Sequence, residues 1–236
     1  MERLNKYLAS CGVCSRRDAD KLIEGRQVTV NGQIAPMGFQ VSGKETICVN
    51  GKVIGSPDKK VVFAYYKPIG VVCTERDSHA DKIITDIVKF PVRVTYAGRL
   101  DKDSEGLILL TNDGELIHRM MTGSEGHEKE YIVKVNKEIT DDFLQKLKNG
   151  VYLSELKVKT RPCEVEKIGK FSFKIILTQG VNRQIRRMCG AFGYQVKSLK
   201  RVRVVNIVLA NLKRGEYRQI QGEELRALYK LTTNIV

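Results

Sequence analysis

The sequence of 236 residues lacks tryptophan and contains only three histidines and five prolines. It also lacks any stretch of about 18 uninterrupted apolar residues, so no transmembrane helix is expected. Its first residues are polar and amphipathic, which differs from the apolar run of a signal peptide. No low-complexity segment is present, and 42% of the residues are apolar, enough for a real core. These absences exclude membrane-spanning, secreted and disordered classes.

Motifs for common cofactors and metals are missing as well. Of the six cysteines, only Cys11 and Cys14 are closely spaced, and one such pair does not complete a four-ligand zinc site. The chain has neither the P-loop motif nor the glycine-rich dinucleotide motif, and its histidines are too dispersed for a Ser–His–Asp triad. We therefore expect no metal ion and no cofactor. Reduced, mostly buried cysteines and a cytoplasmic location fit this cysteine usage.

The charge that the chain does carry is unevenly distributed. Lys and Arg number 41 against 27 Asp and Glu, for a net charge of +14. Residues 157–218 alone contain 16 basic and 3 acidic residues. Over residues 197–204 the cations alternate with strand-like apolar residues, which places several of them on one face of a sheet or hairpin. Such a face fits contacts with the phosphate backbone of a nucleic acid better than a merely solvated surface.

The order of the expected elements divides the chain into two domains. Two short amphipathic helices, the second with Ser15 as its N-cap, precede two strands that each end in an Asn-Gly turn (3–9, 15–25, 27–30 and 47–49). Residues 55–60 have the composition of a linker. We therefore predict a small αα/β domain over residues 1–58 and a larger domain over residues 59–236.

The larger domain alternates strands and helices. Strands are expected at 61–66, 70–74, 93–97, 107–111, 129–136, 162–167, 172–178, 194–197 and 200–209. Helices are expected at about 82–89, 113–121, 140–149, 182–192 and 222–230. Strands that are neighbours in sequence favour hairpins, so the prediction is an α+β fold with a mixed, largely antiparallel sheet.

The densest polar cluster, residues 98–107, lies between two of these strands and holds three acids and two bases. Its opening fits an EF-hand loop, but Asn112 stands where a bidentate Glu is needed and a strand replaces the second helix. A calcium site is therefore disfavoured, while a solvated polar turn remains an alternative.

Two further clusters carry reactive side chains. Asn182 caps a helix on which Arg183, Arg186 and Arg187 fall on adjacent faces, an arrangement that suits phosphate or carboxylate groups. The expected strand 129–136 has Lys129, Tyr131 and Val133 on one face. Composition and spacing thus predict an RNA-binding protein with an unusual acidic loop, and they do not name a reaction.

A resemblance to a known family predicts the reaction. Residues 98–107 read Gly-Arg-Leu-Asp-x-x-Ser-Glu-Gly-Leu and resemble the signature loop of the pseudouridine synthases, in the version of the RsuA/RluB/RluE/RluF group. Segments 66–70, 128–131, 182–188, 215–218 and 223–225 are also similar, although Tyr217 stands where Trp is expected. Residues 3–9, 15–19 and 28–32 resemble an S4-type RNA-binding domain, which precedes the catalytic domain in that group. Details at 127–131 and 178–184 are most similar to the RluF branch.

The resemblance implies an isomerase that breaks the N1–C1′ bond of uridine and joins C5 to C1′. Asp101 takes the place of the essential aspartate, and Arg186 that of its ion-pair partner. Tyr131 corresponds to the residue that stacks on the uracil, and Arg99 to the one that fills the gap left by the flipped base. The sequence does not decide which step Asp101 performs: attack on the sugar, attack on the base or removal of a sugar proton.

Basic residues are expected to contact the RNA, and they are Arg3, Lys6, Arg16, Arg17, Lys67, Arg99, Lys129, Arg183, Arg187, Lys200 and Arg201. The RluF-like details imply a stem-loop of large-subunit ribosomal RNA as the substrate, with a tRNA anticodon stem-loop as a further candidate. We expect a monomer without a membrane partner. The alternatives are a non-catalytic RNA-binding or ribosome-assembly protein that keeps the fold, and a methyltransferase, which the missing Gly-rich cofactor loop disfavours.

Overall fold

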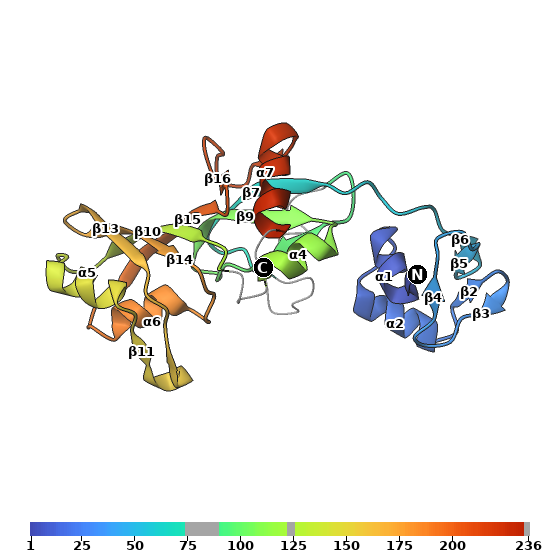
Figure 1. The fold of residues 1–236 in the computed structure, drawn as a ribbon, viewed down its shortest axis with the longest axis horizontal. Helices are drawn as coiled ribbons and strands as arrows, with labels where there is room; N and C mark the ends of the chain where they lie inside the picture. The colour runs from blue at the N-terminus through green and yellow to red at the C-terminus, as the bar shows by residue number, and fades with distance from the viewer. Residues whose placement is uncertain (74–89, 122–125, 234–236) are drawn as a thin grey trace. The chain divides into compact units, whose positions relative to one another are not determined.

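The computed structural model describes residues 1–73, 90–121 and 126–233 (Figure 1). The chain forms two compact units, of which the first comprises residues 1–60 together with 90–94. The first unit thus takes in a short segment that the sequence analysis assigned to the larger domain. The helix expected over 82–89 lies outside the described residues. In the described parts, no helix is long and apolar enough to cross a bilayer.

The first unit packs two helices against short strands. The helices are α1 (Leu4–Ser10) and α2 (Arg16–Glu24), and Ser15 caps α2 as expected, because its Oγ accepts from the Asp18 N–H at 3.2 Å. β1 (Glu2–Arg3) pairs with β4 (Gln40–Val41). A second sheet has the order β3-β2-β5-β6, with bounds Gln33–Ile34, Val28–Val30, Ile47–Val49 and Lys52–Val53. The core lies between the helices and this sheet.

The second unit is built on one large sheet, which has nine strands among the described residues. Its main path runs β13-β14-β10-β15-β9-β7-β17, while β16 pairs with β15 and β8 pairs with β9. The strands span Val62–Lys67 (β7), Thr95–Ala97 (β8), Glu105–Thr111 (β9), Lys129–Val135 (β10), Glu164–Gly169 (β13), Ser172–Leu177 (β14), Val196–Val204 (β15), Ile207–Val208 (β16) and Tyr217–Gln219 (β17). β15 and β9 run parallel, whereas the other described pairs are antiparallel. The α+β fold with a mixed, largely antiparallel sheet is therefore confirmed.

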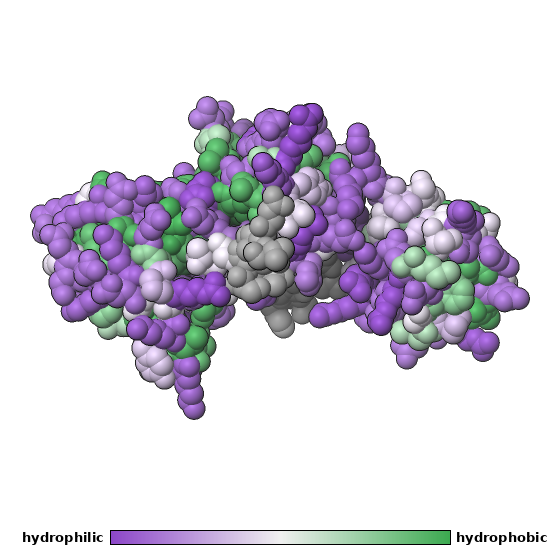
Figure 2. Space-filling view, viewed as in Figure 1, coloured by the Kyte–Doolittle hydropathy of each residue, from purple (hydrophilic) through white to green (hydrophobic). Residues whose placement is uncertain are grey.

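Two pairs of helices cover the two halves of this sheet (Figure 1). α5 (Asp141–Lys148) and α6 (Gln184–Gly190) pack on β10, β13, β14 and β15, where Phe143 and Met188 enter the core. α4 (Gly114–Met121) and α7 (Gly222–Thr233) pack on β7 and β9 through residues such as Leu116 and Leu228. A small hairpin of β11 (Tyr152–Leu153), the 3₁₀ turn η2 (Ser154–Leu156) and β12 (Val158–Lys159) follows α5. Hydrophilic side chains dominate the visible face of this unit (Figure 2).

Several elements differ from the sequence-based expectation: the described part of the strand expected at 70–74 does not form a strand, and β1, β3, β4, β6, β11 and β12 were not predicted. Three further differences concern the surroundings of the site. The strands expected at 194–197 and 200–209 are one strand, β15, followed by a turn at Val205 and the short β16. The helix expected from residue 182 begins only at Gln184, because Arg183 has a left-handed backbone (φ +50°). β17 was not predicted: it is a three-residue edge strand, Tyr-Arg-Gln, whose polar sequence carries no strand pattern.

Candidate active site

The acidic cluster found in the sequence forms a loop, residues 98–104, between β8 and β9. The loop is tied to the segment that follows β7. The buried Leu100 donates its N–H to Cys73 Sγ at 3.4 Å, and the Lys102 carbonyl accepts from the Gly70 N–H at 2.8 Å. Inside the loop, the Ser104 N–H donates to the Asp101 carbonyl at 3.0 Å. These bonds fix the main chain on both sides of Asp101, and they therefore fix the backbone position from which its side chain extends.

Gly106 explains how the loop comes so close to β15. Its φ is +112°, and a Cβ built on it would lie 2.2 Å from the Arg201 carbonyl oxygen. Only glycine fits at that approach. The parallel pairing of β9 with β15 is limited to Glu105 with Lys200 and Gly106 with Arg201. The loop therefore ends directly against the middle of β15.

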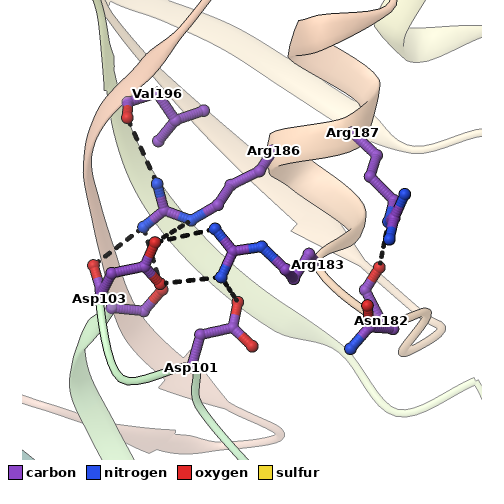
Figure 3. A network of polar contacts seen from close by, with 8 residues as sticks. Asp101, Asp103, Asn182, Arg183, Arg186, Arg187 and Val196 are labelled. Atoms are coloured by element: carbon purple, nitrogen blue, oxygen red, sulfur yellow. Dashed lines mark hydrogen bonds and ion pairs between the residues drawn. The ribbon is translucent and has the colours of Figure 1, made fainter.

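Two arginines from the start of α6 reach the carboxylates of the loop (Figure 3). Arg183 donates to both carboxylate oxygens of Asp103 at 3.2 and 2.9 Å, and its Nη1 lies 3.7 Å from Asp101 Oδ2. The Nε of Arg186 lies 3.3 Å from Asp103 Oδ2. Arg186 also donates to the carbonyls of Asp103 and Val196 at 2.9 and 3.3 Å and to Ser104 Oγ at 3.3 Å. The loop is thus clamped to α6 and β15.

The predicted ion pair between Asp101 and Arg186 is therefore wrong. Arg186 pairs with Asp103, and the arginine that reaches Asp101 is Arg183. The reason is local: Asp103 points both its carbonyl and its carboxylate toward α6 and accepts from both arginines. Burial acts to raise the pKa of Asp103, but the Arg183 hydrogen bond and the charges of Arg186 and Arg183 hold it below the usual value.

A third carboxylate of the loop region, Glu105, is also bound by an arginine. It is buried, accepts from Arg214 at 2.7 and 3.1 Å, and accepts from Tyr66 Oη at 2.9 Å. The hydrogen bond from Arg214 lowers the pKa of Glu105, burial opposes this, and Tyr66 lowers it further. The sequence did not predict this network. Tyr66 nevertheless lies in segment 66–70, and Arg214 immediately precedes segment 215–218, and both segments resemble the family.

Tyr131 lies in the same region of the sheet as the loop. It is directly opposite Arg201 on β15, and Arg201 is opposite Gly106 on β9, which in turn is opposite Lys67 on β7. Two strand spacings separate Tyr131 from Gly106, about 10 Å between backbones. The half-buried Tyr131 ring packs against the core under α5 and α6. The sheet therefore brings the predicted Tyr131 toward the loop that carries Asp101.

Lys67 and Arg201 are not positioned to contact RNA, contrary to the prediction. Lys67 is 0% exposed, and its Nζ donates to the carbonyls of Pro68 and Val71 at 3.0 and 2.8 Å. Arg201 is 2% exposed and donates to main-chain carbonyls. The alternation over 197–204 had predicted outward cations, but β15 is an interior strand of the sheet, and Leu199, Arg201 and Val204 on it are buried.

The remaining predicted cations of this unit divide into exposed and engaged groups. Arg99 and Arg183 are exposed. Arg187 donates to the Asn182 carbonyl and forms an ion pair with Glu155, and Lys200 lies 5.2 Å from the centre of the Tyr66 ring. The half-buried Lys129 donates to the His127 carbonyl at 3.0 Å, and burial together with the Arg201 charge lowers its pKa to about 8.

The predicted cations of the first unit lie on its surface. Arg3, Arg16 and Arg17 are exposed, and the half-buried Lys6 lies 3.9 Å from Glu2. In the described parts of the chain, no group of three or more His, Cys, Asp or Glu side chains is arranged to hold a metal ion. The chemistry available at the loop is that of carboxylates, a tyrosine and arginines.

The fold and this loop belong to a known class of enzyme. Residues 61–191 match the family model of RNA pseudouridylate synthase, and residues 2–47 match that of the S4 domain. The chain therefore belongs to the RNA pseudouridine synthase family, with an S4 domain preceding the catalytic part.

The chain also resembles individual members of this family over nearly its whole length. It is 45% identical over 234 residues to the dual-specificity RNA pseudouridine synthase RluF of Escherichia coli (strain K12), covering 98% of this chain and 80% of that protein. It is 37% identical to the ribosomal large subunit pseudouridine synthase B of Bacillus subtilis (strain 168), covering 98% and 97%. A crystal structure of a pseudouridylate synthase superposes with a TM-score of 0.71 at 29% identity, covering 97% of this chain and all of that one.

Proposed function

We propose that this enzyme isomerises a uridine of large-subunit ribosomal RNA to pseudouridine, with Asp101 as the catalytic carboxylate. One observation carries the assignment of Asp101. The neighbouring carboxylates Asp103 and Glu105 are each held by short hydrogen bonds from arginines. The Asp101 side chain is 32% exposed, and its one arginine contact in the described residues is the 3.7 Å approach of Arg183. Asp101 is thus the loop carboxylate without a short arginine contact among the described residues, which leaves it available to a substrate.

The chemistry requires an ionised carboxylate in a place that an extruded base can reach. The N1–C1′ bond of uridine breaks, a C5–C1′ bond forms, C5 loses its hydrogen as a proton, and N1 takes up a proton. Neither C1′ nor C5 is accessible in a stacked helix, so the uridine must flip into the site. The exposed Arg99, next but one to Asp101, is suited to occupy the space left by the base. Tyr131 supplies an aromatic face for the uracil.

Arg186 has a different role in this proposal from the one that the resemblance implied. It binds the main chain and side chain of Asp103 and the Ser104 hydroxyl, two and three residues beyond Asp101. It therefore acts on the shape of the loop that presents Asp101. Arg183, which is exposed and bridges both aspartates, is placed to exchange part of its contact with Asp103 for an RNA phosphate.

The S4 domain, residues 1–58 in our proposal, supplies additional RNA affinity through Arg3, Lys6, Arg16 and Arg17. The substrate assignment is supported by the relatives, whose names specify the large ribosomal subunit in one case and dual specificity in the other. We accordingly propose a tRNA anticodon stem-loop as a second substrate. The six unpaired cysteines fit a reducing cytoplasm, where we expect the enzyme to act as a monomer.

The test combines chemistry in vitro with mapping in cells. Asp101→Asn should lower tritium release from RNA carrying uridine tritiated at C5 by about 10⁴-fold or more, because the catalytic carboxylate is lost. RNA affinity and the free energy of unfolding should change little. Asp142→Asn, which removes a surface carboxylate paired with Lys146, is the matched control and should keep full activity.

Pseudouridine mapping of total RNA from a deletion strain then identifies the substrate. The missing site should lie in large-subunit ribosomal RNA and should return with the wild-type gene but not with Asp101→Asn. Turnover by Asp101→Asn close to the wild-type rate, or a missing site confined to other RNAs, would contradict the proposal.

A further inference from the structure

Arg201 is buried in the sheet, and the part of the chain that the structure describes gives it no counter-ion. The residue is 2% exposed, and no carboxylate of the described residues forms an ion pair with it. Its Nη2 is buried and has no hydrogen-bond partner among those residues. Burying an unpaired guanidinium is costly, so a fold that only needed a strand residue here would be better served by an apolar side chain. The charge and the planar group at this position require an explanation.

The contacts of Arg201 are with the two ends of the loop that carries Asp101. Its Nε donates to the Leu107 carbonyl at 2.6 Å, and its Nη1 donates to the Arg99 carbonyl at 3.5 Å. Arg99 lies two residues before Asp101, and Leu107 follows the loop on β9. A single rigid guanidinium therefore spans the entry and the exit of the loop.

The main chain of Arg201 contacts the same loop. Its carbonyl and N–H face Gly106 so closely that a Cβ there would lie 2.2 and 2.7 Å from them. The backbone of β15 thus supports the exit of the loop, while the side chain from the same residue reaches across to the entry. Tyr131, which is directly opposite Arg201 on β10, is aligned by the same residue.

Electrostatics favour the same arrangement. Lys67, also fully buried, holds the segment whose Gly70 N–H binds the Lys102 carbonyl. Burial lowers the pKa of Lys67, and the charge of Arg201 lowers it further, whereas Cys73, Asp101 and Asp103 act to raise it. Lys67 thus lies within the electrostatic reach of the two loop aspartates. Its attraction draws the loop toward the sheet.

We propose that Arg201 is a positioning residue, which holds both ends of loop 98–104 and so places Asp101 for reaction without touching the RNA. This inference rests on the proposed function, because it takes Asp101 as the catalytic carboxylate. It assigns to Arg201 an effect on the rate of the bound enzyme–RNA complex and none on RNA affinity.

The experiment uses the full chain with Arg201→Lys, which keeps the charge and loses the planar fork. Arg201→Gln, which keeps an amide donor and loses the charge, is the second variant should the first not fold. Arg203→Lys is the matched control on the same strand, since Arg203 binds Glu128, Glu130 and Val205, all outside the loop. The probe is a large-subunit ribosomal RNA transcript carrying uridine tritiated at C5.

Single-turnover rates at saturating RNA, Kd and thermal unfolding midpoints are measured for each variant, with rates taken well below each midpoint. Arg201→Lys should lower the rate by about 10- to 100-fold, because a displacement of about 1 Å costs that much. Its Kd should stay within about twofold of the wild-type value, and Arg203→Lys should match the wild type in both quantities. A purely structural role for Arg201 would instead lower the unfolding midpoint and leave the rate of the folded variant unchanged.

Three results would overturn the inference: an unchanged rate for Arg201→Lys, a weaker Kd with an unchanged saturating rate, or an equal loss of rate in Arg203→Lys. Asp101→Asn is measured in parallel to separate the two proposals. If Asp101→Asn is inactive while Arg201→Lys is fully active, the positioning role alone fails. If Asp101→Asn turns over at close to the wild-type rate, the proposed function fails and the positioning role fails with it.

Discussion

The two units of this enzyme carry their positive charge in different ways. In the first unit, Arg3, Arg16 and Arg17 are exposed on or beside the two helices. In the second unit, many of the cations that make residues 157–218 so basic are bound by the protein itself, among them Arg186, Arg187, Arg201, Arg203, Arg214 and Arg218. A cation-rich stretch of sequence therefore does not by itself locate the surface that binds RNA.

The difference predicts a division of labour between the units. Exposed cations can exchange water for phosphate, so changes in the first unit should alter affinity and its dependence on salt. Cations held by carbonyls and carboxylates either shape the loop or tie other parts of the fold together, so changes there should alter the rate or the stability. The following variants test this division.

Removing residues 1–58 should have the largest effect on binding. We expect RNA affinity to fall by about 100- to 1,000-fold at moderate salt, because several phosphate contacts are lost together. The large sheet should still fold, since its two cores lie in the second unit. The segment 90–94 loses its packing partners in this variant, and the buried Val94 becomes accessible. Filter binding and circular dichroism measure the two effects, and loss of the folded sheet would contradict the proposed domain boundary.

Arg186→Ala should leave affinity nearly unchanged and reduce the rate. Its side chain is 16% exposed and joins Asp103, Ser104 and Val196, so its loss releases the loop from α6 and β15. We expect about a 100-fold lower single-turnover rate. The free energy of unfolding should fall by about 1–3 kcal/mol, less than for a fully buried pair, because Asp103 is partly exposed. Chemical denaturation and tritium release check the two numbers, and a change in Kd alone would assign Arg186 to the RNA surface.

A pairwise comparison of surface and engaged arginines sharpens the contrast. The double variant Arg16→Ala/Arg17→Ala should weaken RNA binding by about tenfold and flatten the plot of log affinity against log salt. Arg218→Ala, which breaks the ion pair with Glu224, should leave that plot unchanged and cost about 0.5–1 kcal/mol of stability. Salt titrations of Kd and urea unfolding measure the two effects. A changed salt dependence for Arg218→Ala, together with an unchanged one for the double variant, would contradict the division of labour.

Lys129→Met tests a cation intermediate between the two classes. The folded pKa of Lys129 is about 8, below its usual value, since burial and the Arg201 charge disfavour protonation. Between pH about 8 and 10.5 the unfolded chain binds more protons than the folded one, so Lys129 makes stability rise with pH in that window. The variant should lack this rise. Urea unfolding from pH 7.5 to 9.5 measures it, and parallel curves for variant and wild type would show that Lys129 does not titrate there.

Local signals predicted much of the fold correctly. Ser15 caps α2, and the Asn-Gly pairs at 31–32 and 50–51 form turns with positive φ at each residue, because these features depend on a few neighbouring residues. The order of strands was enough to predict a mixed sheet. The three-residue β17 had no such local signal, since its pairing with β7 comes from tertiary packing.

The candidate site was predictable as a loop and not as a network of contacts. The resemblance located Asp101, and the structure places it on a loop between two strands. Spacing alone does not show which of Arg183 and Arg186 faces which aspartate, because that depends on the left-handed backbone of Arg183 and on how α6 lies on the sheet. Similarly, the alternation around Arg201 indicates a strand without showing that Arg201 is buried.

Gly106 has a consequence for the accuracy of the whole site. Since no other residue fits beside the Arg201 backbone, a one-residue slip of β9 along β15 would drive Leu107 or Glu105 into that backbone. The forbidden slip would move the loop by about 3.3 Å along the strand, well beyond the roughly 1 Å that catalysis tolerates. Because residue 106 has no side chain, β9 pairs with β15 in a single register, and this register fixes the position of the loop that carries Asp101.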